Sequence, residues 1–198
     1  MRIAMIGTGY VGLVSGACFS EFGIDVVCVD NVPDKIDSLN KGSIPIYEPG
    51  LDDLVAKNVA AGRLSFTENL VEAVTNADAI FIAVGTPSRR GDGHADLSYV
   101  YNAAREVAQA MNGYTVIVTK STVPVGTGDE VEEIIRQKKH RSLPQNVHHR
   151  RVWIECRFEF GRARLHRRFQ LAGTAWFYGA VLRIRRIARS ANLEPRSR

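Results

Sequence analysis

The sequence predicts an α/β protein in which a doubly wound parallel sheet is followed by an irregular basic segment. Short apolar runs rich in Val and Ile alternate with stretches whose apolar residues recur at helical spacing, which is typical of a parallel sheet with crossover helices. Several of these runs are apolar at successive positions, as expected for strands that helices cover on both faces. A change of charge near residue 137 separates this patterned region from an arginine-rich one.

Five strands are predicted in the first 137 residues. The first, RIAMI, ends at a glycine, and the second, IDVVCVD, is largely β-branched and apolar. Gly23 stops the helix between them. Thr67 is predicted to cap the helix after the third strand, because its hydroxyl can accept a hydrogen bond from a free N–H group. The predicted strands are 2–6, 24–30, 64–66, 79–85 and 114–121, and the predicted helices are 10–23, 33–41, 51–61, 68–77, 97–111 and one that begins near 126.

The composition argues against a membrane protein and an exported protein. Hydrophobic residues make up 45% of the chain, and no apolar run reaches the roughly 18 residues of a membrane span. The cysteines Cys18, Cys28 and Cys156 are an odd number without metal-ligand spacing, and no secretory cleavage pattern is found. The sequence therefore predicts a cytoplasmic protein with neither a membrane partner nor a metal site.

The net charge of +5 combines two regions of opposite sign. Residues 1–137 hold 10 Lys and Arg against 18 Asp and Glu, whereas residues 138–198 hold 16 against 3. The basic total therefore does not describe the patterned region, and it gives no reason to expect that this region binds nucleic acid.

The segment GTGYVG joins the first predicted strand to the first helix. Gly7 permits the tight turn, Gly9 lets a pyrophosphate approach the backbone, and Gly12 lets the helix pack against the strand. The N–H groups around Tyr10 and Val11 lie at the positive end of the helix, which stabilises a phosphate. This turn predicts a Rossmann-type dinucleotide site.

Asp30 stands 18 residues after Gly12, at the end of the second predicted strand. A carboxylate at that place can accept hydrogen bonds from the adenosine ribose, and it repels a 2′-phosphate. No arginine follows to compensate, so the sequence favours NAD over NADP. Lys35 is near enough in sequence to meet the ribose or a phosphate.

Small hydroxyl residues follow two further strands. Thr86 lies in AVGTP, and Ser121 and Thr122 lie in TKSTVPVGTG, in both cases between a buried strand and a proline. Because ligands bind at the carboxyl ends of strands in such sheets, we expect these side chains to meet the nicotinamide ribose or to position a water. Ordinary turn chemistry is the alternative explanation.

Four segments together resemble the N-terminal region of UDP-glucose 6-dehydrogenases, within the UDP-glucose/GDP-mannose dehydrogenase superfamily. They are MIGTGYVGLVSGACFSEFG, IPIYEPGL, AVGTPSRRGDGHADLSYV and TKSTVPVGTG, and the resemblance covers about residues 1–136. It implies NAD-dependent oxidation of UDP-glucose to UDP-glucuronate, which feeds polysaccharide synthesis, in a family of homo-oligomers. This sequence does not fix its own oligomeric state. GDP-mannose or a UDP-N-acetylhexosamine is the alternative substrate.

The resemblance also implies which residues contact NAD. They are Gly7, Gly9, Tyr10, Val11, Gly12, Asp30, Lys35, Thr86, Ser121 and Thr122. Thr122 further resembles a threonine that helps to hold a catalytic water, whereas Glu48 in IYEPGL receives no chemical role. The family's N-P-E-F-L-R-E-G segment and its glycine-flanked cysteine nucleophile are not found, and Cys156 lacks the neighbouring glycines. This chain alone is therefore predicted to bind NAD with weak or no turnover.

The predicted domain boundary lies after residue 137, and three interpretations of residues 138–198 remain open. A shifted coding frame is favoured, because the family resemblance and the charge balance end within a few residues of each other. An arm that binds nucleic acid or an anionic membrane would use the arginines and interleaved aromatic residues. A divergent substrate domain is the third, although 61 residues are few for the parts that it would replace.

Overall fold

The computed structural model describes residues 1–89, 91, 93–112, 115–140 and 153–155 of the 198. The chain divides into two units, Met1–Arg157 and Phe158–Arg198, and every described residue lies in the first. Most of the predicted basic segment, including Cys156, is therefore outside the described residues.

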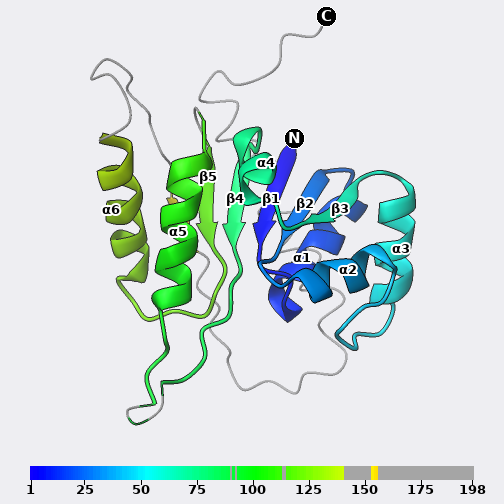
Figure 1. The fold of residues 1–198 in the computed structure, drawn as a ribbon, viewed down its shortest axis with the longest axis horizontal. Coiled ribbons are helices and arrows are strands. Elements are labelled where there is room, and N and C mark those ends of the chain that lie inside the picture. Colours follow the sequence, from blue (N-terminus) through cyan, green and yellow to red (C-terminus); the bar gives the residue numbers. More distant parts are fainter. Residues whose placement is uncertain (90, 92, 113–114, 141–152, 156–198) are drawn as a thin grey trace, which may run out of the picture. The chain divides into compact units, whose positions relative to one another are not determined.

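The described part is built on one parallel sheet in the order β3-β2-β1-β4-β5-β6, of which Figure 1 labels β1 to β5. The chain runs outward from β1 in one direction to β3, and then returns to start the other half at β4. This order confirms the predicted Rossmann-type fold. The strands are β1 (Arg2–Ile6), β2 (Asp25–Val29), β3 (Leu64–Thr67), β4 (Ala79–Ile82), β5 (Val116–Thr119) and β6 (Trp153–Glu155).

In the described residues, six helices connect the strands, and each predicted helix end lies within two residues of the observed end. The difference in helix length is largest before β4, where a predicted helix of ten residues has six. The helices are α1 (Tyr10–Glu21), α2 (Pro33–Asn40), α3 (Leu51–Ala60), α4 (Leu70–Thr75), α5 (Ser98–Ala110) and α6 (Thr127–His140).

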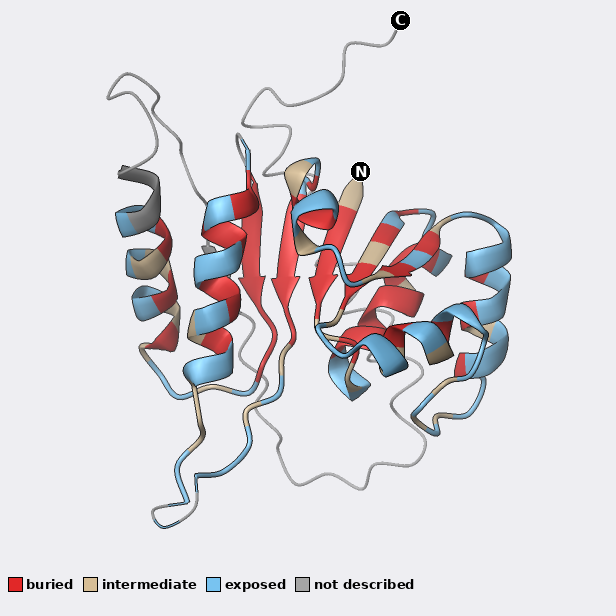
Figure 2. Cartoon of the chain, in the orientation of Figure 1, coloured by how far each residue is buried: buried red, intermediate tan, exposed pale blue. Residues whose placement is uncertain are grey.

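The two faces of the sheet have separate cores. On one face, alternate strand residues such as Ile6, Ile80 and Ile117 pack with buried residues of α4, α5 and α6. On the opposite face, Phe81 of β4 lies beside Met5 in the sheet register, and its ring centroid is 5.0 Å from that of Phe19 of α1. All four residues of β4 and of β5 are buried, as Figure 2 shows in red. This two-sided burial explains the continuous apolar runs in the sequence.

Helix α1 approaches the sheet closely because small residues face it. A Cβ added at Gly16 would lie 2.7 Å from the Cys28 sulfur, and one added at Gly12 would lie 1.9 Å from the Gly7 carbonyl oxygen. A larger side chain at either position would push the helix away from β1 and β2. The predicted packing role of Gly12 thus has a direct geometric basis.

A buried amide of α3 connects the end of α1 to Arg63, the residue before β3. Asn58 is fully buried, and its Nδ2 donates to Glu21 Oε2 at 3.0 Å and to the Leu54 carbonyl at 2.8 Å. Its Oδ1 accepts from Arg63 Nε at 3.1 Å and from Nη2 at 2.8 Å. All four hydrogen-bonding positions of the amide are therefore used, which makes this contact specific.

Two features differ from the sequence prediction. The cap of α4 is Asn69, whose side chain accepts from the Glu72 N–H at 3.1 Å, and Thr67 instead accepts from the Asn69 N–H at 3.0 Å. The prediction that Thr67 caps this helix is therefore wrong. The sheet also has a sixth strand, β6, which pairs with β5 from inside the segment predicted to lack the domain's pattern.

Among the described residues, no helix has both the length and the apolar character needed to cross a membrane. Within the same ranges, no three His, Cys, Asp or Glu side chains come together where they could hold a metal ion.

Candidate functional site

The predicted site residues come from four strand ends on the same edge of the sheet. The glycine turn follows β1, Asp30 follows β2, Thr86 follows β4, and Ser121 with Thr122 follows β5. The strands are parallel and adjacent, so their carboxyl ends face the same side (Figure 1). From β1 the chain first adds strands on one side, as far as β3, and then crosses to the other side of β1 to form β4. Such a reversal of strand order creates a crevice in which ligands bind.

The glycine turn is held tightly at both ends. Gly7 has φ of 101°, and its N–H donates to the Val29 carbonyl at 2.7 Å. A Cβ there would lie 2.7 Å from the Ala83 carbonyl oxygen, so only glycine fits between β1 and β4 without movement. Gly9, in contrast, has ordinary extended backbone, and a Cβ there would meet nothing within 4 Å. Open space therefore lies in front of Gly9.

The first turn of α1 is suited to an anion. Gly9 provides no side-chain cap, and the turn contains no acidic residue. Tyr10 and Val11 are 49% and 40% exposed, so this end of the helix is accessible. The positive end of the helix dipole and the free N–H groups can together bind a phosphate.

The Asp30 carboxylate is only 9% exposed and accepts several hydrogen bonds. Its Oδ2 lies 2.8 Å from Thr8 N, 2.7 Å from Thr8 Oγ1 and 2.7 Å from Lys35 Nζ. Burial alone would raise the pKa of this carboxyl, but the hydrogen bonds from Lys35 and Thr8 outweigh it and lower the pKa. Asp30 is therefore an ionised acceptor at neutral pH.

Lys35 lies where the sequence placed it, but its ammonium group pairs with Asp30. Thr8 is the residue that sequence reasoning missed. Its position between the first two glycines of the motif is the one feature of the sequence that could have drawn attention to it. The motif does not indicate that the Thr8 hydroxyl would meet a carboxylate 22 residues away.

The hydroxyl residues after β4 and β5 bond across the two strand ends. The Thr86 hydroxyl donates to the Thr122 carbonyl at 3.1 Å, and the Ser121 hydroxyl donates to the Val84 carbonyl at 2.7 Å. Ser121 is buried, whereas the Thr122 side chain is exposed at the edge. The Ser121 hydroxyl is thus used largely to connect the two strand ends, whereas the exposed Thr122 side chain can meet a ligand.

A second connection crosses the glycine turn. The Tyr10 phenol donates to the Glu48 carboxylate, and this hydrogen bond, together with burial, raises the tyrosine pKa. Glu48 belongs to the IYEPGL segment, to which the sequence assigned no chemistry. The contact brings that segment beside the start of α1.

The described thiols are not activated. Cys18 and Cys28 form no disulfide, and burial raises the pKa of both, that of Cys28 to about 12. A thiol with so high a pKa is a poor nucleophile at neutral pH.

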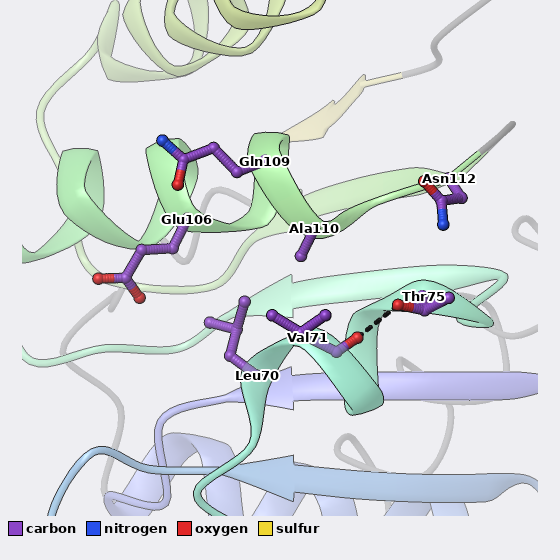
Figure 3. Close-up of a pocket in the computed structure, with 7 residues that line it drawn as sticks. All are labelled: Leu70, Val71, Thr75, Glu106, Gln109, Ala110 and Asn112. Carbon is purple, nitrogen blue, oxygen red and sulfur yellow. Dashed lines mark hydrogen bonds between the residues drawn. The ribbon is translucent and has the colours of Figure 1, made fainter. Parts of the chain in front are cut away.

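A groove of about 490 Å³ lies between α4 and α5 (Figure 3). It has one charged lining residue, Glu106, and the Thr75 hydroxyl bonds to the Val71 carbonyl rather than pointing to a ligand. This groove does not share any residue with the strand-end site. The lining residues are Leu70, Val71, Thr75, Glu106, Gln109, Ala110 and Asn112.

The model of the UDP-glucose/GDP-mannose dehydrogenase family, NAD binding domain, matches residues 1–155. The chain belongs to this family. It is a family of oxidoreductases that act on nucleotide sugars, and the cofactor of this domain is NAD. The match extends beyond the resemblance to residues 1–136 and includes β6.

The relatives are much longer than this chain. The UDP-glucose 6-dehydrogenase of Rhizobium meliloti is 72% identical over 137 residues, which cover 69% of this chain and 31% of that protein. The UDP-glucose 6-dehydrogenase TuaD of Bacillus subtilis is 57% identical over 136 residues, covering 69% and 29%. The chain thus spans about a third of the length of the curated relatives that it matches.

Solved structures show the same partial coverage. A UDP-glucose dehydrogenase from Pyrobaculum islandicum aligns with a TM-score of 0.66 and 42% identity, over 69% of this chain and 32% of that one. A GDP-mannose dehydrogenase from Pseudomonas aeruginosa aligns with a TM-score of 0.68 and 40% identity, over 71% and 33%.

The described residues fit NAD. The close packing at Gly7 and Gly12 leaves the space at Gly9 open, next to a helix end whose first turn contains no acidic residue. Beside it stands an ionised carboxylate that can accept hydrogen bonds from hydroxyl groups.

Proposed function

We propose that this domain binds NAD for the oxidation of UDP-glucose to UDP-glucuronate. The observation that carries the choice of substrate is the 72% identity to a UDP-glucose 6-dehydrogenase, which is well above the 40% identity to a GDP-mannose dehydrogenase. NAD supplies the hydride acceptor for such an oxidation.

The site residues divide the work of holding the cofactor. The turn Gly7–Gly12 and the N–H groups of Tyr10 and Val11 bind the pyrophosphate, since the open space at Gly9 lies beside a helix N-terminus whose first turn contains no acidic residue. Asp30 accepts a hydrogen bond from the adenosine ribose, and Lys35 balances its charge. Thr86, Ser121 and Thr122 line the nicotinamide side of the crevice, where the exposed Thr122 hydroxyl also helps to hold a water.

Titration of the 198-residue chain with NAD tests this assignment. Asp30→Ala should weaken binding about tenfold or more, because it removes a charged acceptor worth about 1.5–3 kcal/mol. Asp25→Ala is the matched control, since Asp25 is exposed at the opposite end of β2 and should leave binding unchanged. Equal NAD affinity in the two variants would contradict the role of Asp30.

We further propose that this polypeptide alone turns over weakly or not at all. It spans about a third of its relatives, and the printed sequence contains neither N-P-E-F-L-R-E-G nor a cysteine flanked by the family's glycines. Mixing the chain with NAD and UDP-glucose and following NADH absorbance tests this. Sustained turnover at rates typical of enzymes would contradict it.

A sibling activity is the second candidate. The Pseudomonas aeruginosa structure is a GDP-mannose dehydrogenase, and a Pyrococcus horikoshii UDP-D-ManNAc dehydrogenase aligns at 31% identity. Tight binding of GDP-mannose or a UDP-N-acetylhexosamine, with none of UDP-glucose, would favour it.

We also propose a domain boundary between residues 1–137 and 138–198, a frame shift near that boundary and a cytoplasmic location. Sequencing across the codons for 136–139 tests the frame shift, because a correction of one or two bases should restore N-P-E-F-L-R-E-G. If the basic segment instead binds nucleic acid, the whole chain should be retained on DNA or RNA in a salt-sensitive way.

A further inference from the structure

The Asp30 carboxylate is bound unequally at its two oxygens. Oδ2 accepts three hydrogen bonds of 2.7–2.8 Å, two from Thr8 and one from Lys35. Oδ1 accepts one described bond, from the Val32 N–H, at 3.3 Å. A carboxylate oxygen offers about two lone-pair sites, so Oδ2 is saturated and Oδ1 has capacity left.

Thr8 contributes the least movable part of this arrangement. It is fully buried and donates from both its backbone nitrogen and its hydroxyl, so two short bonds reach one oxygen from one residue. Lys35 donates through a long side chain that is 27% exposed and can swing away. The position of the carboxylate therefore depends more on Thr8 than on Lys35.

We propose that Thr8 is a positioning residue that fixes the rotation of the Asp30 carboxylate and thereby sets the preference for NAD over NADP. With Oδ2 occupied by the protein, Oδ1 alone is left for a ribose hydroxyl. The Asp30 carboxylate is also held beside the position that the 2′-phosphate of NADP would occupy. NADP therefore meets a negative charge that cannot rotate away. This inference rests on the proposed role of Asp30 in binding the ribose.

Removing the Thr8 hydroxyl should loosen both effects. The backbone N–H remains, but the carboxylate can then rotate, and its hydrogen bond to the ribose weakens. Lys35 can follow the carboxylate or turn toward a 2′-phosphate, which favours NADP. The expected signature is a change in the ratio of the two affinities, because a loss of packing alone would weaken NAD and NADP together.

The test is to measure the Kd of NAD and of NADP by calorimetry for the full chain and for Thr8→Val and Thr8→Ser. Valine keeps the shape of threonine without its hydroxyl, and serine keeps the hydroxyl. We expect T8V to bind NAD about tenfold more weakly, equivalent to about 1.4 kcal/mol. NADP affinity should be unchanged or higher in T8V, and T8S should resemble the unmodified chain in both.

The control Asp30→Ala separates the two levels of the argument. If D30A binds NAD normally, the proposed role of Asp30 fails, and this inference fails with it. If D30A is weakened but T8V keeps the original ratio of NAD to NADP affinity, only the role of Thr8 is refuted. Thermal unfolding checks that each variant is folded, and Thr8→Ala against T8S replaces the comparison if T8V does not fold. Equal affinity ratios in T8A and T8S would overturn the inference in that case.

Discussion

Two glycines of the same motif should respond to alanine in opposite ways. A Cβ at Gly12 would lie 1.9 Å from the Gly7 carbonyl oxygen, whereas a Cβ at Gly9 would meet nothing within 4 Å. Gly9 also has φ of −71° and ψ of −175°, which any residue can adopt. We therefore expect Gly12→Ala to damage the fold and Gly9→Ala to damage NAD binding alone.

The size of each effect follows from these distances. Real Cβ atoms essentially never come within 3.0 Å of another atom, so G12A must separate α1 from the turn by about 1.1 Å, and both partners are backbone. Overpacking typically costs about 1–3 kcal/mol, and we expect the upper end, which lowers Tm by about 6–12 °C for a chain of this size. G9A loses only the small preference for glycine over alanine at a helix N-cap, under about 1 kcal/mol.

The assay combines thermal unfolding followed by circular dichroism with calorimetric titration of NAD. G9A should keep nearly the original Tm and lose about tenfold or more in NAD affinity, because its methyl group occupies the space that a pyrophosphate would enter. G12A should show the large drop in Tm even without NAD. Unchanged NAD affinity in G9A, or an unchanged Tm in G12A, would refute the division of roles between these glycines.

Three further predictions concern stability and reactivity. Asn58→Ala should lower the free energy of unfolding by about 1–3 kcal/mol, because it leaves the Arg63 guanidinium and the Leu54 carbonyl without their amide partner. Urea unfolding measures this free energy. A change within about ±0.5 kcal/mol, which is usual for substitutions at surface sites, would contradict the prediction. The pKa of Asp30 is lowered in the folded chain, so its ionised form stabilises the fold above about pH 4, and that stabilisation is lost as the pH falls through the lower folded pKa. Lys35→Met should raise the folded pKa and shift acid unfolding to higher pH, and an unchanged acid midpoint would show that the ion pair is too screened to matter. Cys28 should resist thiol reagents at pH 8 in a variant with Cys18 and Cys156 replaced by serine, because its pKa is about 12; rapid labelling before unfolding would contradict this.

The sequence predicts the fold well where a local pattern decides the structure. Both faces of β4 and β5 are buried, so their apolar runs identify them without knowledge of their partners. The glycine turn is equally local, since Gly7, Gly9 and Gly12 act within one turn and the first residues of α1. The predicted ends are close to the observed ones for the same reason.

Contacts between distant segments are what the sequence did not predict. Thr8 meets Asp30 across 22 residues, and Tyr10 meets Glu48 across 38, so neither pair leaves a periodic signal. Thr67 and Asn69 both have side chains that could cap α4, and in the structure Asn69 is the cap. Strand β6 was missed because Trp153–Glu155 is three residues long and is surrounded by arginine-rich sequence.

The place of β6 beside β5 has a practical consequence for anyone who shortens this chain. Ending it at Gln137, where the charge changes, would remove Trp153–Glu155 and uncover the backbone amides and carbonyls of Val116–Thr119. An edge strand exposed in this way can pair with the same strand of another copy, which promotes aggregation. Cutting after Arg157 keeps β6 paired with β5, so a protein that ends there should stay monodisperse at concentrations at which the shorter protein precipitates.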